Sequence, residues 1–446
     1  MTTLRSTARN VHGFAGALLF AGLGGAASLT GGEPGAATTL PSTVVPQSCG
    51  MQLKADCCSA ENLEEIRGLG FRFVRRGFIW ADVEKERGVC DFSGYDRLLE
   101  DARQRGLRVL GCIAFDSKLY GPVREPAGRE AYARFAAALA ARYKEHHVIW
   151  EIWNEPNTMT FWGKHGKGNS EQYAAEYTAL VKEVAPAMRK ADPGCFIAAG
   201  SVSCLWPPSY NWTENCFKQG ILQSGVDAWS VHPYGFKSPE EYVEAYAKVR
   251  RMMAQHNAPK DFPLLNSERG YPLKKAEGWA GGPESEAPQY QAWHFVRQYL
   301  VDLLCDVRLT NWYEWTGEEF GIVRGKDRRP AYEACRAMMA QLDGYRLAKR
   351  MPTDAPADFV LLFEKESGEQ RLVAWTSPPA NQSPDRAKAH AVEIPAGAAG
   401  PLEVYDLYGK KSLVSVVDGK ISLTLSGSPQ YVVLQGKAAA LPAPPK

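Results

Sequence analysis

Short apolar runs alternate with amphipathic segments of helical period through most of the chain. The apolar runs predict eight strands, over residues 51–55, 71–75, 107–115, 148–155, 195–201, 227–234, 262–268 and 307–315. The segments of helical period predict helices over residues 60–70, 95–105, 129–143, 171–191, 238–256, 287–304 and 330–342. Strand–helix units repeated over about 290 residues predict an α/β fold, a (β/α)8 TIM barrel that spans residues 48–345.

The pattern changes beyond residue 345. Seven short apolar runs follow, separated by Gly, Asp, Ser and Pro turns with no helical period between them. Such a series predicts a small C-terminal antiparallel β-sandwich over residues 346–436. The final segment, 437–446, is rich in Ala and Pro, and we expect it to be a disordered tail.

The N-terminus has the pattern of a secretory signal peptide over residues 1–28. Arg5 and Arg9 precede a short apolar stretch, and small residues then offer a cleavage site. The stretch is too short and too rich in glycine to predict a membrane span, so none is expected in the mature chain. Residues 29–47 predict a flexible leader. We therefore expect a secreted or periplasmic protein, with a disordered N-terminal tail as the alternative.

Composition and charge suit a large globular protein that does not bind nucleic acid. The 446 residues are 45% apolar and carry a net charge of +2, without a long basic block. An exported chain can form disulfides, and we expect Cys204 to pair with Cys216 because they bracket a Trp/Pro/Asn-rich loop. Neither the ten cysteines nor the eight histidines match a metal-binding motif, so no metal or other cofactor is expected.

The strand predicted over residues 148–155 ends in a polar cluster that a proline closes. Pro156 cannot donate a ladder hydrogen bond, so the strand stops there and Glu155 lies at its C-terminal end. In a (β/α)8 barrel, the C-terminal ends of the strands surround the active site. Glu155 is therefore a candidate catalytic carboxylate, and capping of the next helix is the alternative.

The other predicted strand ends add a second carboxylate and several polar or aromatic side chains. Glu268 ends the seventh strand, nearly opposite Glu155 on the fourth. Two opposed carboxylates suit glycoside hydrolysis, in which one acid protonates the leaving oxygen and one anion meets the anomeric centre. The expected substrate-binding residues at the remaining ends are Arg75, Asp116, Asn154, His232, Tyr234 and Trp315.

The neighbours of the two carboxylates suit these two roles. An apolar aromatic surround keeps a proton donor neutral, and Glu155 has three aromatic neighbours in sequence that could supply it, Trp153, Phe161 and Trp162. The nucleophile needs donors that hold its anion. Arg75 together with His232 or Tyr234 could donate to Glu268.

Five segments together resemble the active-site strands of clan A glycoside hydrolases, most closely those of family 39 and its relatives. They are Val74-Arg75, Ile152-Trp153-Asn154-Glu155-Pro156-Asn157, His232-Pro233-Tyr234, Ser267-Glu268-Arg269-Gly270-Tyr271 and Trp312-Tyr313-Glu314-Trp315. The second glutamate follows the first by 113 residues (268 − 155), on the seventh strand, and this spacing makes the match specific. The resemblance covers residues 50–345, and the trailing β-sandwich also fits the family.

The resemblance implies a retaining glycoside hydrolase that cleaves β-type bonds by double displacement. In such an enzyme Glu155 would be the general acid/base and Glu268 the nucleophile. Asn154 would bind the sugar 2-hydroxyl and Arg75 would orient Glu268. Trp315 would form the platform under the sugar.

Three positions raise questions about this match. Ser267 and Arg269 flank Glu268, where the family often has threonine and an aromatic residue. Arg269 could alter the substrate preference or the ionisation of Glu268. Arg76 places a second base beside Arg75, and the choice of Arg75 as the inward one comes from the resemblance alone.

Structural roles are the alternatives for several candidates. Arg75 and His232 could be buried structural residues, and Asp116 could merely cap a loop.

A non-catalytic carbohydrate-binding protein on a barrel scaffold is the alternative function, which the two intact carboxylates disfavour. The expected partner is a poly- or oligosaccharide; the sugar, the choice of endo- or exo-action and the oligomeric state stay open. Candidates for further sugar platforms, or for core packing, are Trp80, Trp162, Trp206 and Trp212.

Overall fold

The computed structural model describes residues 37–273, 287–380, 382, 387–397 and 400–435. The predicted signal peptide over residues 1–28 and the predicted tail over 437–446 lie outside the described residues, as does the first part of the predicted leader. Within the described ranges, no helix is long and apolar enough to cross a membrane.

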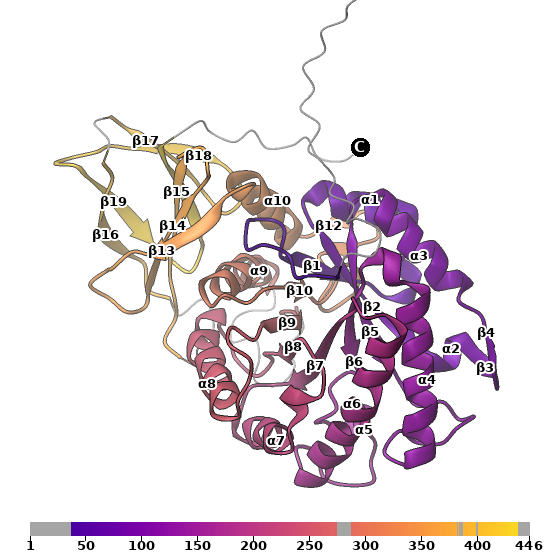
Figure 1. The fold of residues 1–446 in the computed structure, drawn as a ribbon. Helices are drawn as coiled ribbons and strands as arrows, with labels where there is room; N and C mark the ends of the chain where they lie inside the picture. Colours follow the sequence, from indigo (N-terminus) through magenta and orange to yellow (C-terminus); the bar gives the residue numbers. More distant parts are fainter. Residues whose placement is uncertain (1–36, 274–286, 381, 383–386, 398–399, 436–446) are drawn as a thin grey trace, which may run out of the picture. The chain divides into compact units, whose positions relative to one another are not determined.

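Eight parallel strands close into a barrel in the order β1-β10-β9-β8-β7-β6-β5-β2 (Figure 1). The strands are β1 (Cys49–Gln52), β2 (Phe73–Ile79), β5 (Arg108–Ala114), β6 (Ile149–Ile152), β7 (Phe196–Ser203), β8 (Ala228–His232), β9 (Leu264–Arg269) and β10 (Thr310–Trp312). Each overlaps one of the eight predicted strands. The predicted (β/α)8 barrel is therefore confirmed.

Apolar side chains near the N-terminal ends of these strands pack against one another. The cluster contains Phe73, Leu110, Ile149, Phe196, Ala198, Ala228, Leu265 and Leu309. Because successive strand residues point to opposite faces, the same strands bury a second apolar set against the helices. The interior at the C-terminal ends is left to polar side chains, and there the site forms.

The long helices surround the barrel strands (Figure 1). They are α1 (Ala60–Leu69), α3 (Ser93–Gln104), α4 (Pro126–Arg142), α6 (Glu171–Ala191), α7 (Pro207–Lys218), α8 (Tyr242–Gln255), α9 (Ala287–Leu304) and α10 (Pro330–Leu342). The shorter elements are η1 (Ala55–Cys57), α2 (Trp80–Val83), β3 (Glu84–Glu86), β4 (Val89–Cys90), η2 (Lys144–His146), α5 (Met159–Trp162), η3 (Ile221–Gln223), η4 (Pro239–Glu241), β11 (Val323–Arg324) and β12 (Asp327–Arg328).

Helix α7 occupies the segment that the sequence predicted to be a loop between two paired cysteines. Pro207 and Pro208 suggested a loop, but proline is tolerated in the first turn of a helix, where it stands here. Cys216 lies on the buried side of α7, with Sγ 3.8 Å from the Ala174 carbonyl of α6. Cys204 and Cys216 are both free thiols, so the expected disulfide does not form.

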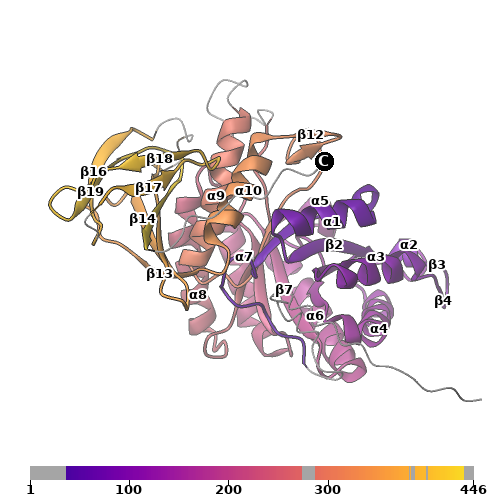
Figure 2. The same ribbon diagram turned by 90° about the horizontal axis from the view of Figure 1, so that it is seen from above.

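The C-terminal strands form two antiparallel sheets, as Figure 2 also shows. The larger sheet has the order β13 (Arg346–Arg350), β14 (Asp358–Glu364), β15 (Gln370–Thr376), β20 (Gln430–Gln435), β17 (Leu402–Tyr405) and β18 (Lys411–Val414). The smaller sheet pairs β16 (His390–Pro395) with β19 (Lys420–Leu425). Strand β19 alternates exposed and buried residues, and its buried side shares one apolar core with β14, β15 and β20. This arrangement is consistent with the predicted β-sandwich.

The described end of the predicted leader, residues 37–47, is anchored to the barrel rather than free. The Thr38 amide donates to the Gly194 carbonyl at 2.8 Å, and the Val45 amide donates to the Tyr345 carbonyl at 2.8 Å. Val45 is buried in the main core. These contacts explain why a segment of loop-like composition takes a defined path.

Candidate active site

Strand β6 ends at Ile152, three residues earlier than predicted, and the chain then turns sharply. Trp153 has φ 70° and Glu155 has φ 47°. Both lie in the left-handed region of backbone conformation, which residues other than glycine rarely adopt. Such strain persists only where surrounding contacts hold it, and it is common at functional sites. Asn157 supplies part of that support, since its side-chain amide donates to the Ser203 carbonyl at 2.9 Å and its Oδ1 accepts from the Ser203 amide.

Arg75 is buried between Glu151 and Glu268 and uses all five of its donors. Nη1 donates to Glu268 Oε2 at 2.7 Å and to Gln52 Oε1 at 3.0 Å. Nη2 donates to Asn154 Oδ1 at 2.8 Å, and Nε and Nη2 both donate to Oε2 of Glu151, at 3.0 and 2.6 Å. Burial alone would lower the pKa of Arg75, but the neighbouring charges, that of Glu151 first and that of Glu268 among the others, together outweigh burial and raise the pKa above its ordinary value.

Arg75, and not Arg76, is therefore the arginine that faces the pocket. Alternate residues of a strand point to opposite faces, and Arg76 lies on the other face of β2 beside Cys58, whose pKa it helps to lower against the effect of burial. The choice that rested on resemblance alone agrees with this geometry.

Glu268 receives a second hydrogen bond from the strand next to it. Tyr234, just past β8, has its hydroxyl 3.2 Å from Glu268 Oε1. Burial, followed by the charge of Glu268, raises the pKa of Tyr234 well above its ordinary value, so the phenol stays protonated and donates. Together Arg75 and Tyr234 hold the Glu268 carboxylate at both oxygens.

His232 faces the other carboxylate. Its Nδ1 lies 3.0 Å from Glu155 Oε1, while its Nε2 lies 3.1 Å from the hydroxyls of both Ser201 and Ser267. Ser201 reaches this position through a bulge in β7, where Gly200 has φ 113° and a Cβ would lie 2.5 Å from the Ser230 carbonyl. Only glycine fits there, so the bulge is built into the sequence.

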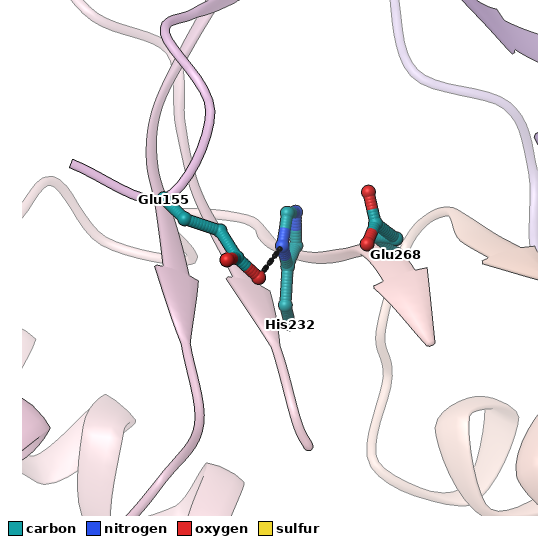
Figure 3. A group of neighbouring side chains, drawn as sticks. All are labelled: Glu155, His232 and Glu268. Atoms are coloured by element: carbon teal, nitrogen blue, oxygen red, sulfur yellow. Dashed lines mark hydrogen bonds and ion pairs between the residues drawn. The ribbon is translucent and has the colours of Figure 1, made fainter. Parts of the chain in front are cut away.

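Figure 3 shows His232 between the two carboxylates, with Glu155 on one side and Glu268 on the other. One ligand atom of each of the three residues lies within 4.8 Å of the others, so the carboxylates approach closely. Both glutamates keep a small exposed fraction, 12% for the Glu155 side chain and 14% for that of Glu268. A separation of about 5 Å suits a retaining glycosidase, whereas inverting enzymes need about 6.5–9.5 Å.

The model of the family Cellulase (glycosyl hydrolase family 5) matches residues 47–304, more than half of the chain. The chain belongs to this family. The match covers the barrel from its first strand to α9 and includes both glutamates. No curated protein sequence matches the chain significantly.

Several solved structures share the fold. A family 39 glycoside hydrolase from Bacteroides cellulosilyticus WH2 matches with a TM-score of 0.68 at 20% identity, over 87% of this chain and 81% of that one. A monomeric β-xylosidase from Caulobacter crescentus CB15 matches with a TM-score of 0.63 at 14% identity, over 89% and 97%. A GH30 endoxylanase from Clostridium papyrosolvens C71 gives 0.55 at 12% identity, over 88% and 97%.

These findings confirm the resemblance to clan A glycoside hydrolases, with family 39 among the similar structures. Members of the clan are glycosidases, and this protein is a retaining glycoside hydrolase. A glycosidase acts on a carbohydrate substrate. The residues that perform the reaction are considered below.

Two predicted substrate-binding residues lie elsewhere than expected. Trp315 is fully buried, and its Nε1 donates to Asn62 Oδ1 of α1 at 3.1 Å, so its ring offers no free face to a sugar. Asp116 accepts the Val123 amide at 2.7 Å and thus caps its own loop, and burial raises the pKa of its carboxyl.

Arg269 also points away from the pocket. Its Nε donates to the Tyr242 hydroxyl at 2.9 Å and its Nη2 donates to the Phe236 carbonyl at 3.0 Å. Its guanidinium stacks 5.0 Å from the ring centroid of Tyr234. Arg269 thus stacks on the tyrosine whose hydroxyl donates to the Glu268 carboxylate.

Two residues near the pocket, Tyr313 and Lys54, were missed by the sequence reasoning. Tyr313 is half-buried, and burial raises the pKa of its phenol, with further effects from the charges of Glu314 and Glu268. Lys54 pairs with Glu314 at 2.7 Å, where 48% of the lysine side chain is exposed. Burial raises the pKa of Glu314. The signal for Tyr313 was present, because it stands two residues before Trp315 at the same strand end.

The four tryptophans considered as further sugar platforms differ in their exposure to solvent. Trp80, Trp162 and Trp212 are buried in the main core. Trp206, directly before α7, is 52% exposed and is the candidate that could stack on a sugar ring.

Glu155, His232 and Glu268 are also residue types that can ligate a metal ion, and their ligand atoms are close enough to do so. A metal bound there would occupy the same oxygens that protonate or attack a glycoside. The expectation that the reaction needs no cofactor stays a prediction.

Proposed function

We propose that Glu155 is the general acid/base and Glu268 the nucleophile of a double displacement on a β-glycoside. In the first step Glu268 forms a bond to the anomeric carbon while Glu155 gives its proton to the departing oxygen. In the second step the Glu155 carboxylate takes a proton from water, and the resulting hydroxyl displaces Glu268. Two inversions give net retention.

The unequal surroundings of the two carboxylates carry this assignment. Glu268 accepts from a permanent cation, Arg75, and from the Tyr234 phenol, which suits a group that must attack as an anion. Among the described residues, the Glu155 side chain has one hydrogen-bond partner, the imidazole of His232, which can face the carboxyl group of Glu155 whether that group is ionised or protonated. That suits a group that gives up and regains a proton in each cycle.

We further propose a poly- or oligosaccharide substrate and an exported enzyme. Asn154 would bind the sugar 2-hydroxyl, and Tyr313 would take the platform role first expected of Trp315. We retain Asp116 as a proposed substrate contact, although its carboxylate accepts the Val123 amide of its own loop. Xylosides are a sensible start for a substrate panel because two solved structures of similar fold are titled a β-xylosidase and an endoxylanase.

The experiment compares the parent with Glu155→Gln and Glu268→Gln on that panel, and follows the anomer of the first product by NMR. We expect the parent to release the β-anomer and both variants to lose turnover by about a thousandfold or more. Wild-type turnover of either variant, on a substrate that the parent cleaves, overturns the assignment.

A chemical rescue separates the two roles. With an activated aryl glycoside and added azide, Glu155→Ala should regain activity and form a β-glycosyl azide, because azide attacks the glycosyl-enzyme in place of water. Glu268→Ala should give the opposite anomer, because azide then replaces the nucleophile. Exchanged products would reverse the roles.

A further inference from the structure

A third carboxylate lies beneath the two proposed catalytic ones and takes no part in the steps above. Glu151 is on β6, four residues before Glu155 (155 − 151), and its side chain is fully buried. It is not at the strand end where the sequence reasoning sought the chemistry. It nevertheless contacts the residue that holds the nucleophile.

The contact between Glu151 and Arg75 is built on one oxygen. Oε2 of Glu151 accepts from both Nε and Nη2 of Arg75, at 3.0 and 2.6 Å. These two bonds fix the plane of the guanidinium and thereby aim Nη1 at Glu268, 2.7 Å away. One cation thus serves two carboxylates.

We propose that Glu151 is a positioning residue for the nucleophile, which orients Arg75 and, by sharing its charge, leaves Glu268 reactive as an anion. This inference rests on the proposed function, since it takes Glu268 to be the nucleophile. It adds a role for a residue whose side chain is fully buried.

Charge counting supports the role. Arg75 with Glu151 forms a neutral pair, so the negative charge of Glu268 is not cancelled by a cation of its own. Burial would raise the pKa of Glu151, but Arg75, then His232, lower it overall, so Glu151 stays ionised. The titratable groups that face or influence Glu151 from the packed elements are Arg75 on β2, Cys112 on β5, Tyr177 on α6 and His232 on β8. Glu268 on β9 shares Arg75 with Glu151.

Glu151→Gln separates charge from shape. The glutamine carbonyl can accept both Arg75 bonds, and its amide can face the hydroxyls of Ser230 and Ser267, which in the parent lower the pKa of Glu151. Without the negative charge of Glu151, the positive charge of Arg75 is shared with Glu268 alone. The nucleophile should then ionise at lower pH and attack more slowly.

The first readout is the pH profile of kcat/KM. The second is the rate of trapping, in which an activated 2-deoxy-2-fluoro glycoside, a slow substrate of retaining glycosidases, leaves its sugar bound to the protein and raises the protein mass. For Glu151→Gln we expect the acidic limb to move down by about one pH unit. Trapping should slow by about tenfold, with KM nearly unchanged. A folded variant with the acidic limb and trapping rate of the parent overturns the proposal.

Asp302→Asn is the matched control, because it exchanges another fully buried carboxyl for an amide, on α9, where its partners are Tyr246, Asn266 and Thr310 and not Arg75. We expect the parent's pH limb and trapping rate in this variant; the same shift in both variants would mark a general effect of exchanging a buried carboxyl for an amide and overturn the proposal. If Glu151→Gln yields no folded protein, Glu151→Asp keeps the charge but draws it back from Arg75, and should slow trapping without moving the limb. Trapping at the parent's rate in Glu151→Asp would then overturn the proposal.

The two proposals fail in distinguishable ways. If the fluoro sugar labels a residue other than Glu268 in the parent, the proposed function fails. If it labels Glu268 and Glu151→Gln behaves as the parent does, only the role of Glu151 fails.

Discussion

Nδ1 of His232 lies 3.0 Å from Oε1 of Glu155, in a position where no part of the imidazole is exposed. Two serine hydroxyls face the other ring nitrogen at 3.1 Å, so the ring orientation is set by contacts on both sides. The imidazole is thus a fixed partner for the proposed proton donor.

Replacing His232 should weaken proton donation more than nucleophilic attack. For His232→Asn we expect kcat/KM to fall by about a hundredfold on substrates with poor leaving groups, and much less on activated aryl glycosides, which need little protonation. A series of aryl glycosides of graded leaving-group acidity measures this. An equal loss across the series would mean that His232 only supports the fold.

Tyr313 and Trp315 should respond in opposite ways, because the structure places one at the pocket and the other in the core. Tyr313→Ala should raise KM by about tenfold, the loss of a stacking contact of roughly 1–1.5 kcal/mol, with little change in thermal stability. Trp315→Phe should lower Tm and leave KM unchanged, because the indole packs on Tyr332 and donates to Asn62. Steady-state kinetics and thermal melting of both variants test the assignment; a raised KM in Trp315→Phe would restore the platform first predicted.

Asp302 makes stability depend on pH. Burial raises the pKa of this carboxyl to about 7, against donors from Asn266, Thr310 and Tyr246 that lower it. The folded protein then holds a proton that the unfolded chain loses above its ordinary pKa of about 4. Stability from this group is full below pH 4 and is lost as pH rises toward 7, by about 1.4 kcal/mol per unit.

Asp302→Asn should remove that slope. Its stability relative to the parent should rise between pH 5 and 8, since the amide never ionises and can still accept from Asn266 and Thr310. Urea unfolding at several pH values measures the difference. A constant difference across this range would contradict the raised pKa.

Glu240 and Arg297 form a buried ion pair whose loss should be costly. Glu240 accepts from Arg297 Nε at 2.7 Å and from the Trp375 indole at 2.7 Å, and the arginine side chain is fully buried. Glu240→Gln leaves that arginine charge uncompensated, so unfolding should cost about 3 kcal/mol less. Glu130→Gln, which removes the exposed partner of Arg134, is the control and should change urea unfolding little.

Local sequence pattern determined the framework of this protein. Strand runs and helical periods placed all eight barrel strands and most of the helices, because burial on one face imposes a period that the sequence must carry. Pro156 and the polar cluster before it marked Glu155, and the strand count placed Glu268 opposite. These inferences need only neighbours along the chain.

Tertiary structure decided which side chains meet. The alternation that assigns a face applies only within a strand, and β10 ends at Trp312, so an irregular backbone sends Tyr313 to the pocket and Trp315 to the core. The sequence did not predict Glu151 as a functional residue because its proposed role depends on contact with Arg75, which is 76 positions away in the chain. A contact across a closed barrel depends on how the strands are staggered, and no local period records that.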